Sequence, residues 1–182
     1  MFRSNRQYVS NLPAGWRRLQ LHQFVDIKPG GKLRLTKQKH YSPTGTKAFS
    51  ASGQDGYVNQ TEFEGKAVIL SSIGAKCGKA FYAEGQWTTL ANTTIIKPNQ
   101  NECMTRFLWH VLDDISFWPR SGTAQPFISP QDIKSAWVPI PPISIQRDIS
   151  RHLDQYLSLI HEYTSEIDSL LELQHTLRYN FL

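Results

Sequence analysis

The 182-residue sequence has little cysteine and no long apolar run. Its two cysteines, Cys77 and Cys103, are too few for a disulfide framework and fit a reducing compartment, where each is expected as a small core residue. The longest uninterrupted apolar run is AVIL at 67–70, far short of a membrane span. The first ten residues, MFRSNRQYVS, contain two arginines and no apolar segment, so we expect no secretory signal. These absences favour a soluble cytoplasmic protein.

Motifs for nucleotide, cofactor and metal chemistry are also missing. The segment GAKCGK (74–79) has three residues between its glycines instead of the four of a phosphate-binding loop. Ala80 follows it, where a Ser or Thr would bind magnesium, so the segment is more typical of a tight turn between strands. No glycine-rich turn suits a dinucleotide, and no Cys–His spacing suits zinc. We therefore expect no cofactor and no bound metal.

One catalytic candidate remains. Asp55, Glu64 and Lys66 have the acid, acid-x-Lys spacing of magnesium-dependent nucleases, in which two carboxylates hold the ion and the lysine stabilises developing charge. The same letters, EFEGK, are also typical of a β-turn before a buried strand at Ala67–Leu70. A small nuclease that uses these three residues is therefore kept as the alternative to a protein that binds without catalysis.

Acidic residues are absent from one long stretch, between Ile27 and Gln54. Residues 1–143 hold 17 Lys and Arg against 9 Asp and Glu, whereas residues 144–182 hold 3 against 6. A basic field of this kind favours a polyanion such as DNA, although each base alone is equally typical of a solvated surface. We predict that the acid-free stretch is a long loop with short strands, and that it contacts phosphates and base edges. The candidate DNA-binding residues are Lys28, Lys32, Arg34, Lys37, Lys39 and Lys47, with Lys76, Lys79 and Arg120 as a second group.

The hydrophobic pattern predicts an α+β fold. Short strands separated by glycine turns are expected at Ala67–Leu70, Lys79–Ala83 and Thr93–Lys97. An amphipathic helix follows in CMTRFLWHVLDDI (103–115), where apolar residues recur at helical spacing. We therefore divide the chain into a β-rich globular domain at 1–143 and a long C-terminal helix at 144–182.

The C-terminal segment has the heptad pattern of a coiled coil. No Gly or Pro interrupts it from Ser144 onwards, and about 33 helical residues would form a rod of roughly 50 Å. A single helix this long and one-sided must pack on another helix, so the partner is a second copy or another protein, unless the helix folds back on its own domain. The predicted interface residues are Ile149, Leu153, Tyr156, Ile160, Tyr163, Ile167, Leu170 and Leu177.

The segment SGTAQPFISPQDI (121–133) lies between these two parts and has no basic residue. Gly122 permits a turn, and Ser129 followed by Pro130 is typical of a helix start, so a short helix is predicted at Pro130–Ser135. We interpret the segment as the joint that fixes the globular domain against the long helix. Thr123 and Gln125 are expected to hydrogen-bond the helix or a partner backbone.

Three segments in order resemble the specificity subunits of type I restriction–modification systems. They are LPAGWRRLQLHQFVDIKPG (12–30), FEGKAVILSSIGAKCGKAFYAEGQWTTLANTTIIKP (63–98) and SGTAQPFISPQDIKSAWVPIPPISIQRDISRHLD (121–154). Members of this family usually carry two target recognition domains, each followed by a long helix. The two helices pack antiparallel as a spacer, so that each domain recognises one half of a split DNA site.

This chain has one such unit only. The resemblance implies a non-catalytic DNA-binding subunit that works with a modification methyltransferase subunit and a restriction subunit. It further implies that two copies pair through their helices as a homodimer, which would recognise a palindromic split site. Besides the nuclease, a helical adaptor that only bridges proteins stays open as a third interpretation.

Overall fold

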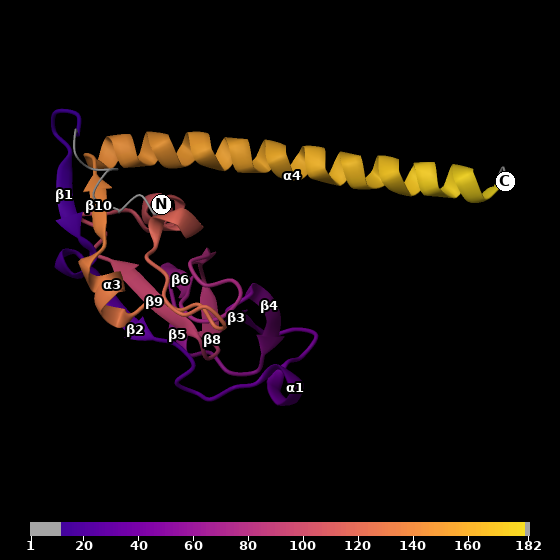
Figure 1. The fold of residues 1–182 in the computed structure, drawn as a ribbon, viewed down its shortest axis with the longest axis horizontal. Coiled ribbons are helices and arrows are strands. Elements are labelled where there is room, and N and C mark those ends of the chain that lie inside the picture. The colour runs from indigo at the N-terminus through magenta and orange to yellow at the C-terminus, as the bar shows by residue number, and fades with distance from the viewer. Residues whose placement is uncertain (1–11, 181–182) are drawn as a thin grey trace.

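Three antiparallel or mixed sheets build a globular domain, and one long helix leaves it at the C-terminal end (Figure 1). The computed structural model describes residues 12–180, so the N-terminal segment in which we expect no secretory signal lies outside the described residues. The α+β fold class predicted from the sequence is confirmed.

The first sheet forms the centre of the domain because its middle strands are apolar on both faces. Its order is β2 (Val25–Pro29), β9 (Thr93–Pro98), β6 (Ala67–Ser71), β7 (Ala80–Ala83). Successive side chains of a strand point to opposite faces, so the side chains of β6 contribute to two hydrophobic cores. Val68 and Leu70 pack with the helix α2 (Thr105–Leu112), whereas Ala67 and Ile69 pack towards the second sheet.

The second sheet has the order β4 (Gly53–Val58), β3 (Thr46–Ser50), β8 (Gln86–Thr89), β5 (Phe63–Glu64). Trp87 of β8 is fully buried between the sheets and stacks on Phe63 with ring centroids 4.6 Å apart. Its indole Nε1 donates a hydrogen bond of 2.9 Å to the carbonyl of Gly65. The polar atom of the largest buried ring is therefore satisfied by the turn that the sequence predicts before β6.

The domain is closed by a two-stranded sheet of β1 (Arg17–Gln20) and β10 (Trp137–Ile140) and by short helical segments. The helix α3 starts as predicted, because Ser129 Oγ accepts a hydrogen bond of 3.0 Å from the backbone N–H of Asp132. The short segments are η2 (Leu21–Gln23), α1 (Lys37–His40), η3 (Ile115–Phe117) and α3 (Pro130–Ser135).

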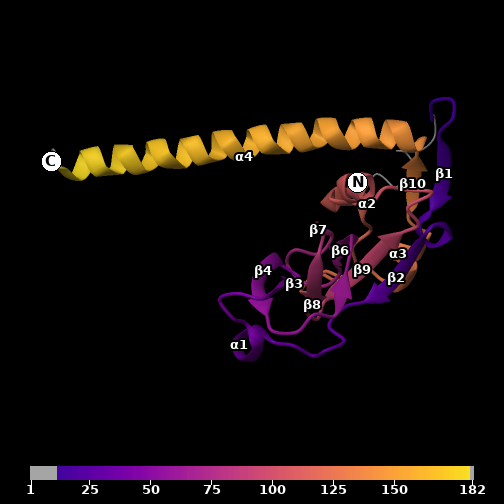
Figure 2. The same cartoon turned by 180° about the vertical axis from the view of Figure 1, so that it is seen from behind.

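The helix α4 (Ile143–Asn180) begins after Pro141 and Pro142 and extends well beyond the domain (Figures 1 and 2). Only its first turns contact the domain, and every described side chain from Gln155 to Tyr179 is exposed. The helix therefore does not fold back on its own domain within residues 12–180. None of the described helices is long and apolar enough to cross a membrane.

Candidate nucleic-acid interface

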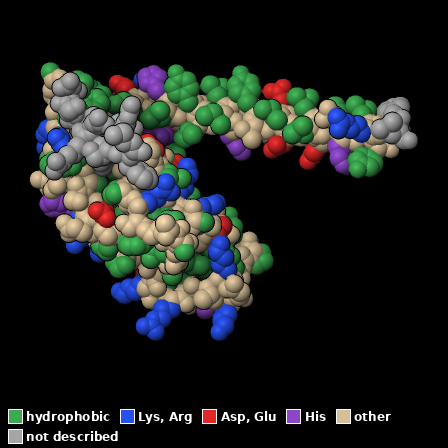
Figure 3. All heavy atoms as spheres, viewed as in Figure 1, with side chains coloured by type: hydrophobic (Ala, Val, Ile, Leu, Met, Phe, Trp, Pro, Cys, Tyr) green, Lys and Arg blue, Asp and Glu red, His purple; other side chains and the backbone are tan. Residues whose placement is uncertain are grey.

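The acid-free stretch lies at the end of the domain that is farthest from α4. Its bases come from the end of β2, the loop before α1, α1 itself and the start of β3. Figure 1 shows α1 at this distal end, and Figure 3 shows Lys and Arg side chains projecting there, while Asp and Glu side chains lie along α4. The charge separation seen in the sequence is therefore also a separation in space.

The loop between β2 and β3 is held to the sheets at several points. The backbone N–H of Gly31 donates to Thr89 Oγ1 at 3.2 Å, and Leu35 is buried with Val58 and Leu90. Tyr41 packs so closely against Gly56 that a Cβ added there would lie 2.1 Å from its ring. The loop therefore holds its bases in a fixed place, and Gly56 is needed for that packing.

Asp55 is the main polar anchor of this loop. It is the extra residue of a β-bulge in β4, a feature that redirects a side chain out of the regular alternation. Its carboxylate accepts hydrogen bonds from Tyr41 Oη at 2.5 Å and Ser50 Oγ at 2.6 Å, and forms an ion pair with Lys37. Burial works to raise the pKa of Asp55, but the hydrogen bonds from Lys37, Ser50 and Tyr41 outweigh burial and lower it.

The six predicted bases of this stretch therefore differ in availability. Lys37 is held by Asp55, and Lys28 pairs with Asp26 at 2.6 Å on the same strand. Within residues 12–180, no carboxylate forms an ion pair with Lys32, Arg34, Lys39 or Lys47.

The second predicted group lies elsewhere, near α2 and the turn between β6 and β7. Lys76 belongs to the GAKCGK segment, which forms the predicted tight turn: the N–H of Cys77 donates to the carbonyl of Gly74 at 2.9 Å. Lys79 pairs with Asp113 at 3.1 Å, and Arg120 precedes the 121–133 segment. The structure therefore does not bring the two predicted groups onto one element.

The structure separates the three residues of the nuclease alternative. Asp55 is in β4 and Glu64 is in β5, and these are the opposite edge strands of the second sheet. Three inter-strand steps of about 4.8 Å place them roughly 14 Å apart, too far to share one ion. Lys66 instead pairs with Glu84 at 3.2 Å. Among the described residues, no group of three acidic, histidine or cysteine side chains is close enough to hold a metal.

The predicted joint segment is bonded to the globular domain. Ser121 and Phe127 exchange two backbone hydrogen bonds of 2.9 Å around the turn at Gly122, whose φ is +81°. The carbonyl of Pro126 accepts from the N–H of Gly74 at 2.8 Å, so the loop is attached to the β6–β7 turn. Thr123 and Gln125 are exposed at the tip of the loop, away from α4 contacts, and Ser129 caps α3.

Two polar residues of α4 form hydrogen bonds with the domain, in addition to the packing of Ile149 against its core, and the sequence pattern gave no signal for either. Gln146 is fully buried; its Oε1 accepts from the N–H of Met104 at 2.8 Å. Its Nε2 donates to the carbonyls of Glu102 at 3.0 Å and Pro141 at 2.8 Å. Eight residues further on, Asp154 contacts two side chains of α2.

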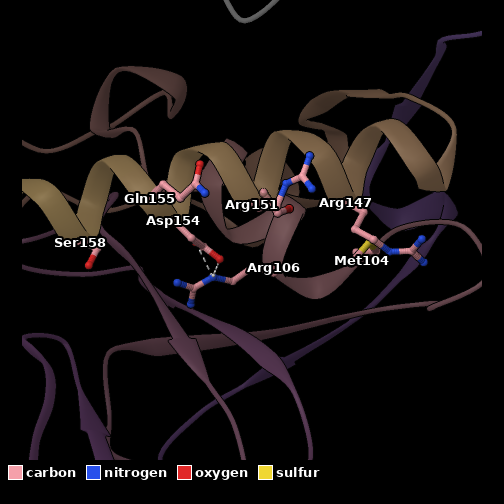
Figure 4. A pocket seen from close by; sticks show the side chains of 8 residues that line it. Met104, Arg106, Arg147, Arg151, Asp154, Gln155 and Ser158 are labelled. Carbon is pink, nitrogen blue, oxygen red and sulfur yellow. Dashed lines mark hydrogen bonds and ion pairs between the residues drawn. The ribbon is translucent and has the colours of Figure 1, made fainter.

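Asp154 lies between Arg106 and His110 (Figure 4 shows the contact with Arg106). Its Oδ1 accepts from Arg106 Nε at 2.8 Å and from His110 Nε2 at 2.7 Å. Because a carboxylate only accepts, the imidazole carries its proton on Nε2. Burial lowers the pKa of His110 and Arg106 adds to this, and together they outweigh the opposing hydrogen bond and charge of Asp154. Arg106 also stacks over the rings of Tyr82 and Trp109, 4.7 and 4.4 Å from their centroids.

The predicted helix interface is an exposed apolar stripe, apart from its first member. Ile149 packs against the domain core. The other seven side chains are 38–64% exposed: Leu153, Tyr156, Ile160, Tyr163, Ile167, Leu170 and Leu177. We call these seven residues the α4 stripe. Exposed apolar side chains in such a row are typical of a surface that packs against another helix.

Comparisons with known proteins agree on one family. A family model, described as the type I restriction modification DNA specificity domain, matches residues 13–173. A putative type I specificity subunit of Mycoplasma pneumoniae is 23% identical over 172 residues, which cover 92% of this chain and 56% of that protein. A second M. pneumoniae protein, the N-terminus of a putative type I specificity subunit, is 27% identical over 96 residues, 51% of each chain.

Solved structures share the fold. The S subunit of a type I restriction-modification system from M. genitalium has a TM-score of 0.66 at 16% identity, over 86% of this chain and 42% of that chain. The HsdS subunit from Thermoanaerobacter tengcongensis has a TM-score of 0.61 at 19% identity, over 85% and 40%. The chain spans about half the length of the curated relatives it matches.

Proposed function

This chain belongs to the type I restriction modification DNA specificity domain family, and we propose that it recognises a specific DNA sequence on behalf of a type I restriction–modification complex. In this proposal the chain directs a modification methyltransferase subunit and a restriction subunit to the site. The partner subunits carry out methylation and cleavage, and the chain itself is not an enzyme. The complex works on DNA in the cytoplasm.

The observation that carries the proposal is the rigidly held, acid-free loop at the distal end of the domain. Among the described residues, Lys32, Arg34, Lys39 and Lys47 form no ion pair, so their charges are available to phosphates; Lys32 also lies near Glu62, where its charge opposes the burial that raises the pKa of that carboxyl. Phosphate contacts place a protein on the duplex, and base-edge contacts from the same loop supply the specificity. A loop held at Asp55 loses little conformational entropy on binding, which favours affinity.

We propose that two copies pair through the α4 stripe as an antiparallel homodimer. Covering the stripe removes apolar surface from water, at about 25 cal/mol per Å². Antiparallel pairing over the stripe and Ile149 would centre on Tyr163 and place the two recognition domains at opposite ends of the paired helices.

The dimer would restore two recognition domains, which agrees with a match that covers 56% of the first M. pneumoniae specificity subunit. A two-fold protein dimer binds two inverted half-sites at a fixed separation. The proposed target is therefore a palindromic, split DNA sequence.

A binding experiment with the purified chain distinguishes this function from the two alternatives, a magnesium-dependent nuclease and a helical adaptor. The chain is mixed with duplex DNA at low and high salt, and separately with plasmid and Mg²⁺. We expect DNA binding that weakens steeply with salt and an intact plasmid. Plasmid cleavage by the chain alone would instead support the nuclease, and no DNA binding at low salt would support a helical adaptor.

A further inference from the structure

Two residues of α4, Gln146 and Asp154, form hydrogen bonds with the domain, and they lie at different distances from the start of the helix. Gln146 is at the start of the helix, and Asp154 is two turns later, about 12 Å along the axis. Gln146 is enclosed by backbone groups of Glu102, Met104 and Pro141 and bonds to all three. Together with Ile149, which packs against the core, and the buried Ser150, this point fixes the start of the helix, and all of these contacts lie before Asp154.

Asp154 supplies the second point. Arg106 and His110 are one turn apart on α2, so the carboxylate is held between two donors on the same helix face. Arg106 is itself held by stacking on Tyr82 of β7 and on Trp109, whose Nε1 donates to the carbonyl of Ala80 at 3.0 Å. The donors are therefore part of the rigid domain, and they set the direction of α4 as well as its origin.

Beyond Asp154, the described side chains of α4 from Gln155 to Tyr179 are all exposed. Figure 4 shows the surroundings of Asp154: an open pocket of about 490 Å³ between α2 and α4, lined also by Arg147, Arg151 and Ser158. Ile149 and Ser150 contact the domain nearer the start of the helix, so removal of the ion pair shortens the part of α4 that the domain holds. Within the described part of the chain, Asp154 is the last residue of α4 that contacts the domain.

We propose that Asp154 is a positioning residue that sets the angle between the recognition domain and α4, and so the one separation of half-sites that the dimer accepts. The proposal rests on the proposed function. A domain of about 130 residues is roughly 35 Å across. A tilt of about 10° at α4 then moves the distal basic loop by about 6 Å, nearly two base pairs at about 3.4 Å each. A small change in the angle of α4 at Asp154 therefore produces a large change in the separation of the two half-sites.

Selection from a random DNA library tests the proposal without knowledge of the target sequence. Wild-type protein, Asp154→Ala and Asp154→Asn are each used to enrich bound duplexes. The control is Asp148→Ala, which removes another α4 carboxylate, one that pairs with Arg151 on the same helix and not with the domain. We expect the wild type and the control to enrich inverted half-sites at one separation. Asp154→Ala should enrich the same half-sites at several separations, and Asp154→Asn should fall between.

Enrichment of one unchanged separation by Asp154→Ala would overturn the inference while leaving the proposed function intact. If the wild type enriches no paired half-sites, the proposed dimeric function fails, and the inference fails with it. The result for the wild-type protein therefore shows whether the proposed function or only the role of Asp154 is wrong.

A distance measurement on the free protein provides a second readout. Spin labels are placed at Lys47→Cys at the start of β3 and at Glu172→Cys on α4. The native Cys77 and Cys103 are buried in the domain and remain unlabelled. Labelled chains are diluted with unlabelled chains so that only distances within one chain are measured. We expect a narrow distance distribution that broadens in Asp154→Ala, with a single cooperative thermal unfolding transition of the variant as the check that its domain is folded. An equally narrow distribution in the folded variant would contradict the proposal.

Discussion

Tyr41 donates a hydrogen bond of 2.5 Å from its hydroxyl to the carboxylate of Asp55, and this contact joins the basic loop to the second sheet. Burial and the neighbouring carboxylate both raise the pKa of Tyr41, so the phenol keeps its proton and remains a donor. Lys37 forms an ion pair with the same carboxylate. One acidic residue therefore organises a loop that has no acidic residue of its own.

Replacing Asp55 by Ala should weaken both the fold and DNA binding. The substitution leaves Tyr41 and Ser50 without their acceptor, at a cost of about 1–3 kcal/mol in the free energy of unfolding. Urea denaturation measures this destabilisation, and DNA titration measures the accompanying fall in affinity. Lys66→Ala is the control, because it removes an exposed ion pair with Glu84. If Asp55→Ala bound DNA with the affinity of the wild type, the anchoring of the basic loop by Asp55 would not matter for binding.

Removing the unpaired charges of the loop should reduce the salt dependence of DNA binding. In a triple variant with Lys32, Arg34 and Lys39 changed to Ala, the slope of log K against log salt should fall by about 0.9 for each phosphate that the protein no longer neutralises. Titration at a series of salt concentrations gives the slope. A triple variant with the slope of the wild type would remove this loop from the interface.

A charge within the α4 stripe should dissociate the dimer. Ile160→Asp places a carboxylate in the proposed helix–helix contact, where burying an unpaired charge is unfavourable. The matched control is Ser165→Asp, which adds the same charge to an exposed position on the opposite side of α4. Sedimentation should show a dimer for the wild type and the control and a monomer for Ile160→Asp. A wild-type monomer at micromolar concentration would contradict the pairing.

Acid should destabilise the domain through His110. Its pKa is lowered in the folded protein from the ordinary value of 6.5, mainly by burial. Below pH 6.5 the unfolded chain therefore binds a proton more readily, so stability is complete above this pH and falls as the pH drops towards the folded-state pKa. The decrease is about 1.4 kcal/mol for each unit between the two pKa values.

Chemical denaturation between pH 7.5 and pH 5 tests this dependence. His110→Gln should flatten the decline, and His152→Gln, at an exposed position of α4, is the control for removing one imidazole. An unchanged decline in His110→Gln would assign the acid sensitivity to other groups.

Local patterns in the sequence predicted much of the fold. The apolar run AVIL predicted β6, and Ser129 with Pro130 predicted α3 at its observed bounds, Pro130–Ser135. The heptad pattern predicted a long helix from Ser144, one residue after its observed start. These elements follow from neighbouring residues, which is why a single sequence was sufficient for them.

The contacts that orient the site could not be predicted in the same way. Gln146 and Asp154 are polar residues on a helix, a pattern that is normally solvated, yet they bond to residues 42 and 44 positions earlier. Likewise, the spacing of Asp55 from Glu64 and Lys66 in the sequence suggested a metal ligand. Its actual contacts, with Lys37 and Tyr41, depend on a β-bulge that no local pattern reveals. Burial and long-range pairing decide the roles of these side chains.

Sequencing the sites that the modification methyltransferase subunit methylates, when it is assembled with this chain, tests most directly whether the chain selects the DNA target. We expect methylation at a palindromic sequence made of two inverted half-sites with one fixed separation, and none when the chain is omitted. Methylation at the same sites without the chain, or at sites with no common sequence, would contradict it.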